Sequence, residues 1–224
     1  MTSTTKTSAL DFHDKLIAKK GVKDASGFSE QGRNTRFEII LKCLSDFTDP
    51  NLFLLDYGCN DGEFYQALLR IMPRSKVVRY EGVDIHPKFI HWAKERWREH
   101  PVTFWVGNAL VDADHDRITK HNPDIIVASG TMCYQGAEDT FPELIRRLYT
   151  SAKQCFIFNV LAADVPKKYM NPRLVQQSKE LYRWKVEDLL KAIQSTGCAA
   201  WDIRRSYLHN DITVVLRKHW SHFR

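Results

Sequence analysis

The sequence predicts an α/β fold: a doubly wound, mostly parallel seven-stranded sheet with a closing antiparallel hairpin and an N-terminal helical cover. Two observations support this prediction. Five short apolar runs alternate with helical segments, as in a sheet buried on both faces: residues 52–55, 77–83, 102–106, 124–128 and 154–160. Two further strand-like runs, 199–207 and 212–217, flank a short polar loop, which is typical of an antiparallel hairpin.

The length and composition of the chain fit one globular domain. Its 224 residues are 43% hydrophobic and 27% charged, which is enough apolar material for one well-packed core. No apolar run approaches the ~18 residues that a membrane-spanning helix needs. Residues 1–10 are rich in Ser and Thr and lack an apolar stretch, so we expect a disordered lead-in there and no secretory signal. We expect residues 11–224 to form a single domain, with residues 11–48 as the helical cover. Within this cover the apolar spacing predicts a helix over 12–20, a loop over 21–32 and a second helix over 37–44.

The cysteines, the histidines and the net charge restrict the chemistry. Five cysteines are scattered without a C-x-x-C pair, which argues against a zinc site or a disulfide framework and for a reducing compartment, the cytoplasm. The nine histidines show no H-E-x-x-H spacing, so the sequence predicts no metal site. A net charge of +6 would suit an anionic partner, but the basic residues are spread along the chain, and a mildly basic surface explains them more simply.

The segment after the first predicted strand organises the rest of the chain. Asp56 stands where the strand ends, Gly58, Asn60 and Gly62 lie in the turn, and a helical run begins at Glu63. A strand, a glycine turn and a helix form the first unit of a nucleotide-binding α/β domain. Glycine lets a ligand approach the backbone closely, and the start of the helix offers unpaired N–H groups.

The acidic character of this turn indicates which ligand it suits. A dinucleotide site would carry the spacing G-x-G-x-x-G, and a P-loop would carry Lys followed by Ser or Thr, but the turn has neither. Asp61 and Glu63 occupy the places where a phosphate would lie. An acidic turn repels an anion and suits a ligand with cationic groups, such as the sulfonium and amino groups of S-adenosylmethionine.

The spacing Asp56-x-Gly58-x-Asn60-x-Gly62 resembles the first motif of the class I S-adenosylmethionine-dependent methyltransferases, Asp/Glu-x-Gly-x-Gly-x-Gly. The resemblance implies a methyltransferase with S-adenosylmethionine as its cofactor. The departure is Asn60 in place of the middle glycine. Asparagine is the non-glycine residue that best tolerates a left-handed backbone, so we expect the turn to survive.

Further residues take roles that the resemblance implies. Asp84 follows the second predicted strand, where the family carries an acid that accepts hydrogen bonds from both ribose hydroxyls. Ile85 would then lie against the adenine. Asn108 and Ala109 stand where relatives often show Gly-Asp-Ala, with an acid that accepts from the adenine amino group. The amide of Asn108 keeps a carbonyl acceptor for this role.

The segment before the first strand is similar to that of a group of bacterial and phage methyltransferases within the class. They place an aromatic residue, a Gln and an Arg-Phe pair there, as this chain does with Phe28, Gln31, Arg36 and Phe37. The resemblance implies that Gln31 and Arg36 reach over the cofactor and that Arg36 pairs with its carboxylate. A surface arginine on a cover helix is the alternative.

The loop after the fourth strand should face the transferable methyl group. Ligands of open α/β sheets bind at the carboxyl ends of the strands, beside the switch point, and Ser129 and Gly130 lie there. Residues 161–180 form a long insertion that we expect to fold as a lid over the acceptor. Three residues are candidate substrate contacts: Tyr134, Tyr169 and His209. We assign no catalytic base.

The residues do not identify the methyl acceptor and leave three hypotheses open. The chain lacks the Asn/Asp-Pro-Pro-Tyr/Phe sequence of enzymes that methylate amino groups of DNA bases, so that acceptor is not expected. The hypothesis that we favour is a methyltransferase acting on a small molecule. The positive charge would suit a methyltransferase acting on RNA. The third hypothesis is a module that binds the cofactor without turnover, since Asn60 and Asn108 depart from the residues that are commoner in the family.

Overall fold

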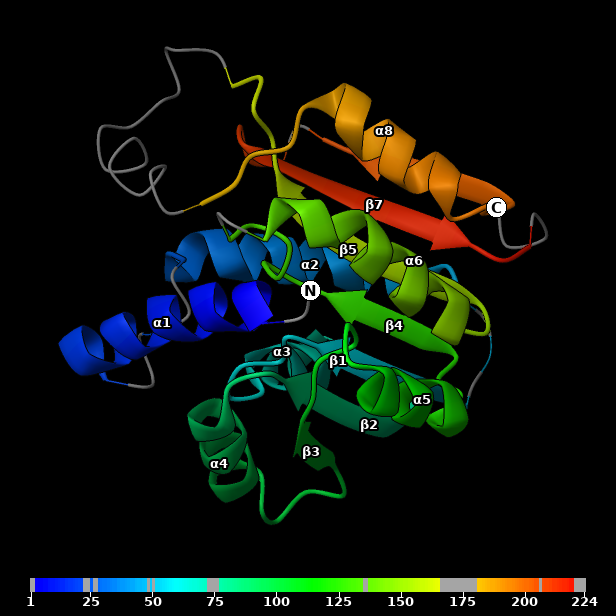
Figure 1. The fold of residues 1–224 in the computed structure, drawn as a ribbon. Helices are drawn as coiled ribbons and strands as arrows, with labels where there is room; N and C mark the ends of the chain where they lie inside the picture. The colour runs from blue at the N-terminus through cyan, green and yellow to red at the C-terminus, as the bar shows by residue number, and fades with distance from the viewer. Residues whose placement is uncertain are drawn as a thin grey trace.

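A seven-stranded sheet forms the centre of the molecule, with the strand order β3-β2-β1-β4-β5-β7-β6 (Figure 1). The computed structural model describes residues 3–21, 25, 28–47, 49, 51–71, 77–134, 137–165, 181–205 and 207–219. Its strands are β1 (Leu52–Tyr57), β2 (Val77–Asp84), β3 (Thr103–Val106), β4 (Ile125–Ala128), β5 (Cys155–Leu161), β6 (Ala200–Arg204) and β7 (Asp211–Arg217). Strands β1 to β5 are parallel, and β7 is antiparallel to its neighbours β5 and β6. The predicted fold class and its closing hairpin are confirmed.

Helices cover both faces of this sheet, and each face has its own apolar core. One layer consists of α2 (Glu30–Ser45), α3 (Glu63–Ile71) and α4 (Pro87–Arg96). The other consists of α5 (Asp112–His121), α6 (Phe141–Ser151) and α8 (Val186–Ser195), with the 3₁₀ turn η2 (Glu138–Thr140) leading into α6. In Figure 1 the second layer lies in front of the sheet, and α2 and α3 lie behind it.

Burial on both faces explains why the central strands are continuously apolar. All six residues of β1 are buried. Leu52 and Leu54 pack on the layer of α2 and α3, whereas Leu55 and Tyr57 pack on the layer of α5 and α6, because side chains alternate along a strand. The two cores hold the strands in register, so their carboxyl ends, where polar residues begin, meet at one edge of the sheet.

The N-terminal helix differs from the expectation. We predicted a disordered lead-in over residues 1–10 and a helix over 12–20, but α1 is Ser3–Lys20. Ser and Thr lower the helical propensity of a segment without forbidding a helix. Ala9 is buried against the rest of the protein, and such packing is what stabilises most protein helices.

Helix α2 also begins earlier than the sequence predicted, since a loop was expected as far as residue 32. Ser29 caps this helix, and its hydroxyl oxygen accepts a hydrogen bond from the Gly32 N–H at 3.2 Å. A serine cap of this kind satisfies one of the N–H groups that a helix start leaves unpaired.

Part of the expected lid lies outside the described residues. Of the insertion 161–180, Leu161 ends β5 and residues 162–165 are described, while residues 166–180, including Tyr169, are not. Among the described helices, none combines the length and the apolar character that crossing a membrane requires. Within the same part of the chain, no group of three or more His, Cys, Asp or Glu side chains could hold a metal ion.

Candidate functional site

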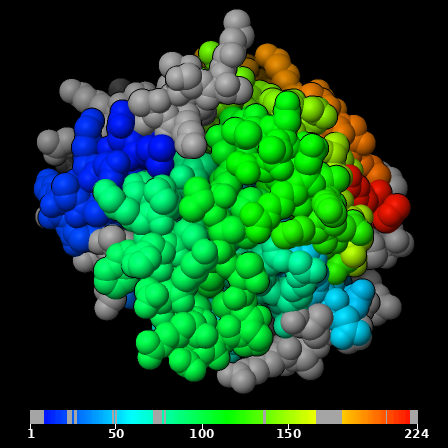
Figure 2. Space-filling model, turned by 60° about the horizontal axis from the view of Figure 1, so that its bottom comes forward, coloured from blue at the N-terminus to red at the C-terminus, as the bar shows by residue number. Residues whose placement is uncertain are grey.

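A cavity lies at the carboxyl ends of β1 to β4, partly covered by α1. The empty space between its lining residues amounts to about 1040 Å³, open solvent included. Residues from the four strand ends line it together with Ala9 and His13 of α1. Figure 2 shows α1, in blue, packed beside α4, and Lys88 of α4 donates to the Asp14 carboxylate of α1 at 2.6 Å.

The turn after β1 forms the floor of the cavity in the predicted conformation. Gly58 has a φ of 78° and Asn60 a φ of 53°, so the left-handed backbone that we predicted at Asn60 is confirmed. A side chain on Gly58 would collide with Thr131. Gly62 does not line the cavity, and a Cβ there would lie 2.5 Å from the Trp97 indole nitrogen. Gly62 is therefore needed for packing rather than for ligand approach.

Asp84 is held firmly at the cavity wall. One carboxylate oxygen accepts from the Asn60 N–H at 2.9 Å and the other from the His86 N–H at 2.8 Å. The side chain is only 8% exposed, and burial raises the pKa of this carboxyl to about 6. A carboxylate has about four acceptor positions, so two remain for the ribose diol that we predicted at this residue.

Asp56 lies at the end of the neighbouring strand and lines the same cavity. The Tyr80 hydroxyl donates to its carboxylate at 2.6 Å. Burial raises the pKa of Asp56 to about 7, and the nearby charge of Asp84 acts in the same direction. A cation in the cavity would favour the ionised form of both acids.

The loop after β3 supplies Asn108 to the cavity, but not in the predicted orientation. The Asn108 carbonyl oxygen accepts from the Leu110 N–H at 3.0 Å and from the Tyr57 hydroxyl at 3.4 Å. The Tyr57 oxygen in turn accepts from the Ala109 N–H at 3.1 Å. The oxygen that we expected to meet the adenine amino group is therefore engaged with the loop itself. Ala109 is fully buried and does not line the cavity.

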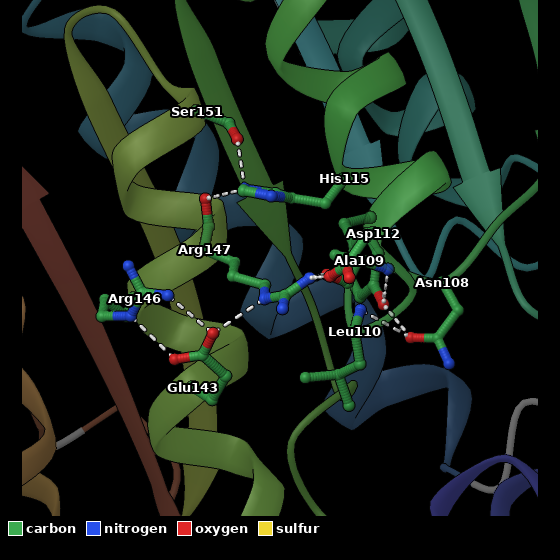
Figure 3. A network of polar contacts seen from close by, with 10 residues as sticks. Asn108, Ala109, Leu110, Asp112, His115, Glu143, Arg146, Arg147 and Ser151 are labelled. Carbon is green, nitrogen blue, oxygen red and sulfur yellow. Dashed lines mark hydrogen bonds and ion pairs between the residues drawn. The ribbon is translucent and has the colours of Figure 1, made fainter. Parts of the chain in front are cut away.

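A polar network behind this loop fixes its position (Figure 3). Arg147 of α6 donates to the Ala109 carbonyl at 3.2 Å and to Glu143 at 2.7 Å. It also lies 2.8 Å from the Asp112 carboxylate of α5. The loop is thus tied to both helices that follow it, and the sequence alone gave no sign of this link.

The two residues predicted to reach over the cofactor from α2 do not line the cavity. Gln31 is exposed. Arg36 is buried, and its guanidinium donates to Asp211 at 2.6 Å and stacks on Phe28 at 4.0 Å. The structure thus gives Arg36 an internal partner in place of the predicted cofactor carboxylate.

Arg33, and not Arg36, is the arginine of α2 that lies at the cavity. It lies almost one helical turn earlier on α2 and lines the cavity, with its Nε 2.7 Å from the Glu63 carboxylate. Burial raises the pKa of Glu63 to about 7, against the lowering effect of Arg33. Both residues were visible in the sequence, but no local pattern shows which arginine of a helix faces a ligand.

The loop after β4 closes the cavity on its other side. Ser129 and Gly130 line it, as predicted. The Gly130 N–H donates to the Asn159 side chain at 2.8 Å. A Cβ on Gly130 would lie 2.7 Å from the Phe28 ring, so Phe28 can cover this loop only because the residue is glycine.

The predicted substrate residues have different outcomes. Tyr134 lines the cavity, and its hydroxyl is 2.8 Å from the His13 ring of α1. His209 is exposed in the turn between β6 and β7 and does not line the cavity. Tyr169 lies outside the described residues. Sequence reasoning missed His13, which faces inward from a helix with only a weakly amphipathic pattern.

Comparison with known proteins identifies the family. A family model described as a methyltransferase domain matches residues 48–212. No curated protein matches the sequence.

Solved structures share the fold at low sequence identity. Magnesium protoporphyrin IX methyltransferase (ChlM) from Synechocystis PCC 6803, solved with bound SAH, has a TM-score of 0.67 and 14% identity, covering 96% of this chain and 100% of its own. The methyltransferase domain of bacterial CtHen1-CN has a TM-score of 0.62 and 13% identity, covering 82% of this chain and 98% of its own. The CurJ carbon methyltransferase has a TM-score of 0.62 and 14% identity, covering 96% of this chain and 67% of its own.

The family model spans well over half of the chain, and the solved methyltransferases share its fold. The chain therefore belongs to the methyltransferase-domain family.

Proposed function

We propose that the cavity binds S-adenosylmethionine, with the ribose on Asp84 and the adenine beside Ile85 and Leu110. The protein then transfers the methyl group of this cofactor to a small molecule. The methionine end then follows the backbone of Gly58 to Asn60, and Arg33 lies within the same cavity as a partner for the carboxylate. The observation that carries the proposal is the pair of buried acids, Asp56 and Asp84, at the ends of adjacent strands.

The residues that line the cavity fit this cofactor in charge and in shape. Two carboxylates with raised pKa values favour a ligand that brings positive charge and hydroxyl donors. The left-handed turn at Gly58 and Asn60 leaves backbone open to close approach. When bound, S-adenosylmethionine supplies a methyl group on a positively charged sulfur. The chain's own task is to hold the acceptor in line with that group, and such positioning is worth roughly 7–11 kcal/mol.

A small acceptor is favoured by the cover over the cavity. Helix α1 contributes Ala9 and His13 to the lining, and Phe28 lies over Gly130, so the space beside the loop after β4 is enclosed by aromatic and aliphatic side chains. A small, partly apolar molecule fits such a space better than a polymer does.

RNA is the alternative acceptor, suggested by the net charge of +6. Much of the positive charge on the described residues is engaged with acids, in pairs such as Arg79 with Glu81, Arg96 with Asp61, Arg205 with Asp164 and Arg217 with Asp46. Filter binding of a single-stranded RNA over a range of salt concentrations separates the two acceptors. Salt-dependent binding would favour RNA, and no binding would favour the small molecule.

Titration calorimetry with S-adenosylmethionine tests the cofactor site. We expect Asp84→Asn to weaken binding roughly 10- to 100-fold, because a hydrogen bond to a charged group contributes ~1.5–3 kcal/mol. Asp188→Asn is the matched control, since Asp188 is exposed on α8 and pairs only loosely with Lys191 at 3.4 Å. Equal affinity in the Asp84 variant and the wild type would contradict the ribose assignment.

A cytoplasmic location completes the proposal. All five cysteines are free thiols in the structure, and four of them are buried. Free thiols persist where the surroundings are reducing.

A further inference from the structure

The cavity has a polar pair in its cover that the cofactor assignment does not use. His13 of α1 and Tyr134 of the loop after β4 both line the cavity. His13 is 6% exposed, and its two ring nitrogens lie 2.9 Å from the Ala25 carbonyl oxygen and 2.8 Å from the Tyr134 hydroxyl. Phe12 packs against the Tyr134 ring, with the centroids 5.4 Å apart. The hydroxyl of Tyr134 is therefore held in one place.

The chemistry of the three groups fixes the direction of both hydrogen bonds. A carbonyl oxygen can only accept, so the Nδ1 of His13 donates to Ala25. Burial lowers the pKa of His13 to about 4, so the ring is neutral and its Nε2 carries a lone pair. The Tyr134 hydroxyl must then donate to Nε2. Its single hydrogen is used in this bond, and toward the cavity the tyrosine oxygen can accept a hydrogen bond but cannot donate one.

We infer that Tyr134, oriented by His13, selects an acceptor molecule that presents an O–H or N–H group to the cavity. A ligand atom that can only accept, such as an ether or carbonyl oxygen, would face the lone pairs of the tyrosine oxygen and leave both groups unsatisfied. Tyr134 is thus a specificity residue, and His13 is a positioning residue that acts through it. The inference rests on the proposed function, because it treats this side of the cavity as the acceptor side.

The side chains around the pair indicate the rest of the acceptor. Ala9 and Phe28 line the cavity near the pair, one on the same helix as His13 and the other against Gly130. Aromatic and aliphatic walls around one oriented polar atom favour a flat apolar ring that carries a hydroxyl or an N–H. The chemical class is therefore a phenol-like or indole-like molecule.

Matched probe pairs test this inference without knowledge of the natural acceptor. In the pairs phenol and anisole, and indole and 1-methylindole, a methyl group replaces the hydrogen that is available for donation. Each probe is titrated by protein-observed NMR into the S-adenosylhomocysteine-loaded protein. We expect the donor of each pair to bind roughly 3- to 10-fold tighter in the wild type, the value of one neutral hydrogen bond.

Three variants separate recognition from a structural effect. Tyr134→Phe should bring each affinity ratio close to one. His13→Leu should release the tyrosine hydrogen, so that anisole binds more tightly than it does to the wild type. Tyr182→Phe is the control, since Tyr182 does not line the cavity, and it should keep the wild-type ratios.

Calorimetry with S-adenosylhomocysteine distinguishes failure of this inference from failure of the cofactor site. Binding to the wild type and undiminished binding to Tyr134→Phe are expected. A tenfold loss of that binding in the variant would place the hydroxyl on the cofactor and overturn the inference. Equal binding of both members of each pair to the wild type, or binding of neither member, would also overturn it, while absence of S-adenosylhomocysteine binding would overturn the proposed function itself.

Discussion

At the scale of single residues, the two buried carboxylates set the electrostatics of the site. Asp56 and Asp84 have pKa values raised to about 7 and about 6, because burial disfavours their charged forms. For an acid with a raised pKa, stability is greatest while the group is protonated and is lost as the pH rises through the raised value. Ionising the two acids is therefore unfavourable without a neighbouring positive charge, and a ligand with positive charge and hydroxyl donors offsets this cost.

The affinity for S-adenosylmethionine should depend on pH in a definite direction. Well below pH 6 both acids are protonated, and well above pH 7 both are ionised. Only the ionised forms attract the sulfonium and accept from both ribose hydroxyls, so we expect the dissociation constant to fall as the pH rises through this interval. Calorimetry at a series of pH values measures it. A flat profile, or one that Asp84→Asn leaves unchanged, would speak against the assignment of Asp84.

At the scale of elements, α2 carries two arginines with separate tasks. Arg36 points to Asp211 at the start of β7, and Asp211 also accepts from the Asn159 amide of β5 at 3.1 Å. The pair therefore ties the helical cover to the closing strands. Arg33 points to the cavity and to Glu63 of α3. One helix thus holds the fold together through one side chain and faces the ligand with another.

Substituting the two arginines should separate stability from binding. Arg36→Ala leaves the Asp211 carboxylate buried without its charge partner, so we expect a loss of ~3–5 kcal/mol in the free energy of unfolding. Arg33→Ala should lose less stability than Arg36→Ala, because Glu63 keeps some access to solvent, but it should bind S-adenosylmethionine more weakly. Urea denaturation followed by circular dichroism, together with calorimetry, measures both quantities. The reverse pattern would indicate that Arg36 pairs with the cofactor carboxylate, as the family resemblance implied.

Helix α6 positions the loop after β3 through Arg147, and the chain offers a neighbouring control. Arg147 donates to the Ala109 carbonyl, whereas Arg146 binds only Glu143 among the described contacts. We expect Arg147→Ala to lower the affinity for S-adenosylmethionine roughly 3- to 10-fold, the value of one hydrogen bond. Arg146→Ala should leave it unchanged, because exposed ion pairs contribute little. Equal effects of the two substitutions in calorimetry would show that Arg147 acts only through the charge of α6.

At the scale of the whole molecule, the sheet brings together side chains that the chain keeps far apart. The order β3-β2-β1-β4 places the ends of four strands side by side, and the cavity forms where the connections leave in opposite directions from β1 and β4. In doubly wound sheets ligands bind at this point. Helix α1, near the N-terminus, covers this cavity. Its His13 contacts the Tyr134 hydroxyl, and its Asp14 accepts from Lys88 of α4. This side of the cavity is thus built from segments more than a hundred residues apart.

The sequence by itself determined the strands, the glycine turn and the acidic strand ends. These features depend on neighbours a few residues away: apolar runs predict buried strands, and Asn60 tolerates its left-handed backbone wherever the turn lies. Asp84 could be placed for the same reason, since its position follows from the end of one strand. The predicted β2 accordingly differs from the observed strand by one residue at its end, and the predicted β5 by one residue at each end.

Only the tertiary structure decided which polar side chains meet. Arg36 and Asp211 are 175 residues apart, and His13 and Tyr134 are 121 apart, so neither pairing leaves a local pattern. The direction in which a helix faces depends on how it packs against the sheet, and this decided that Arg33 rather than Arg36 lines the cavity. Local backbone preferences are encoded within short segments, whereas partners across the fold are chosen by packing, which no short segment contains.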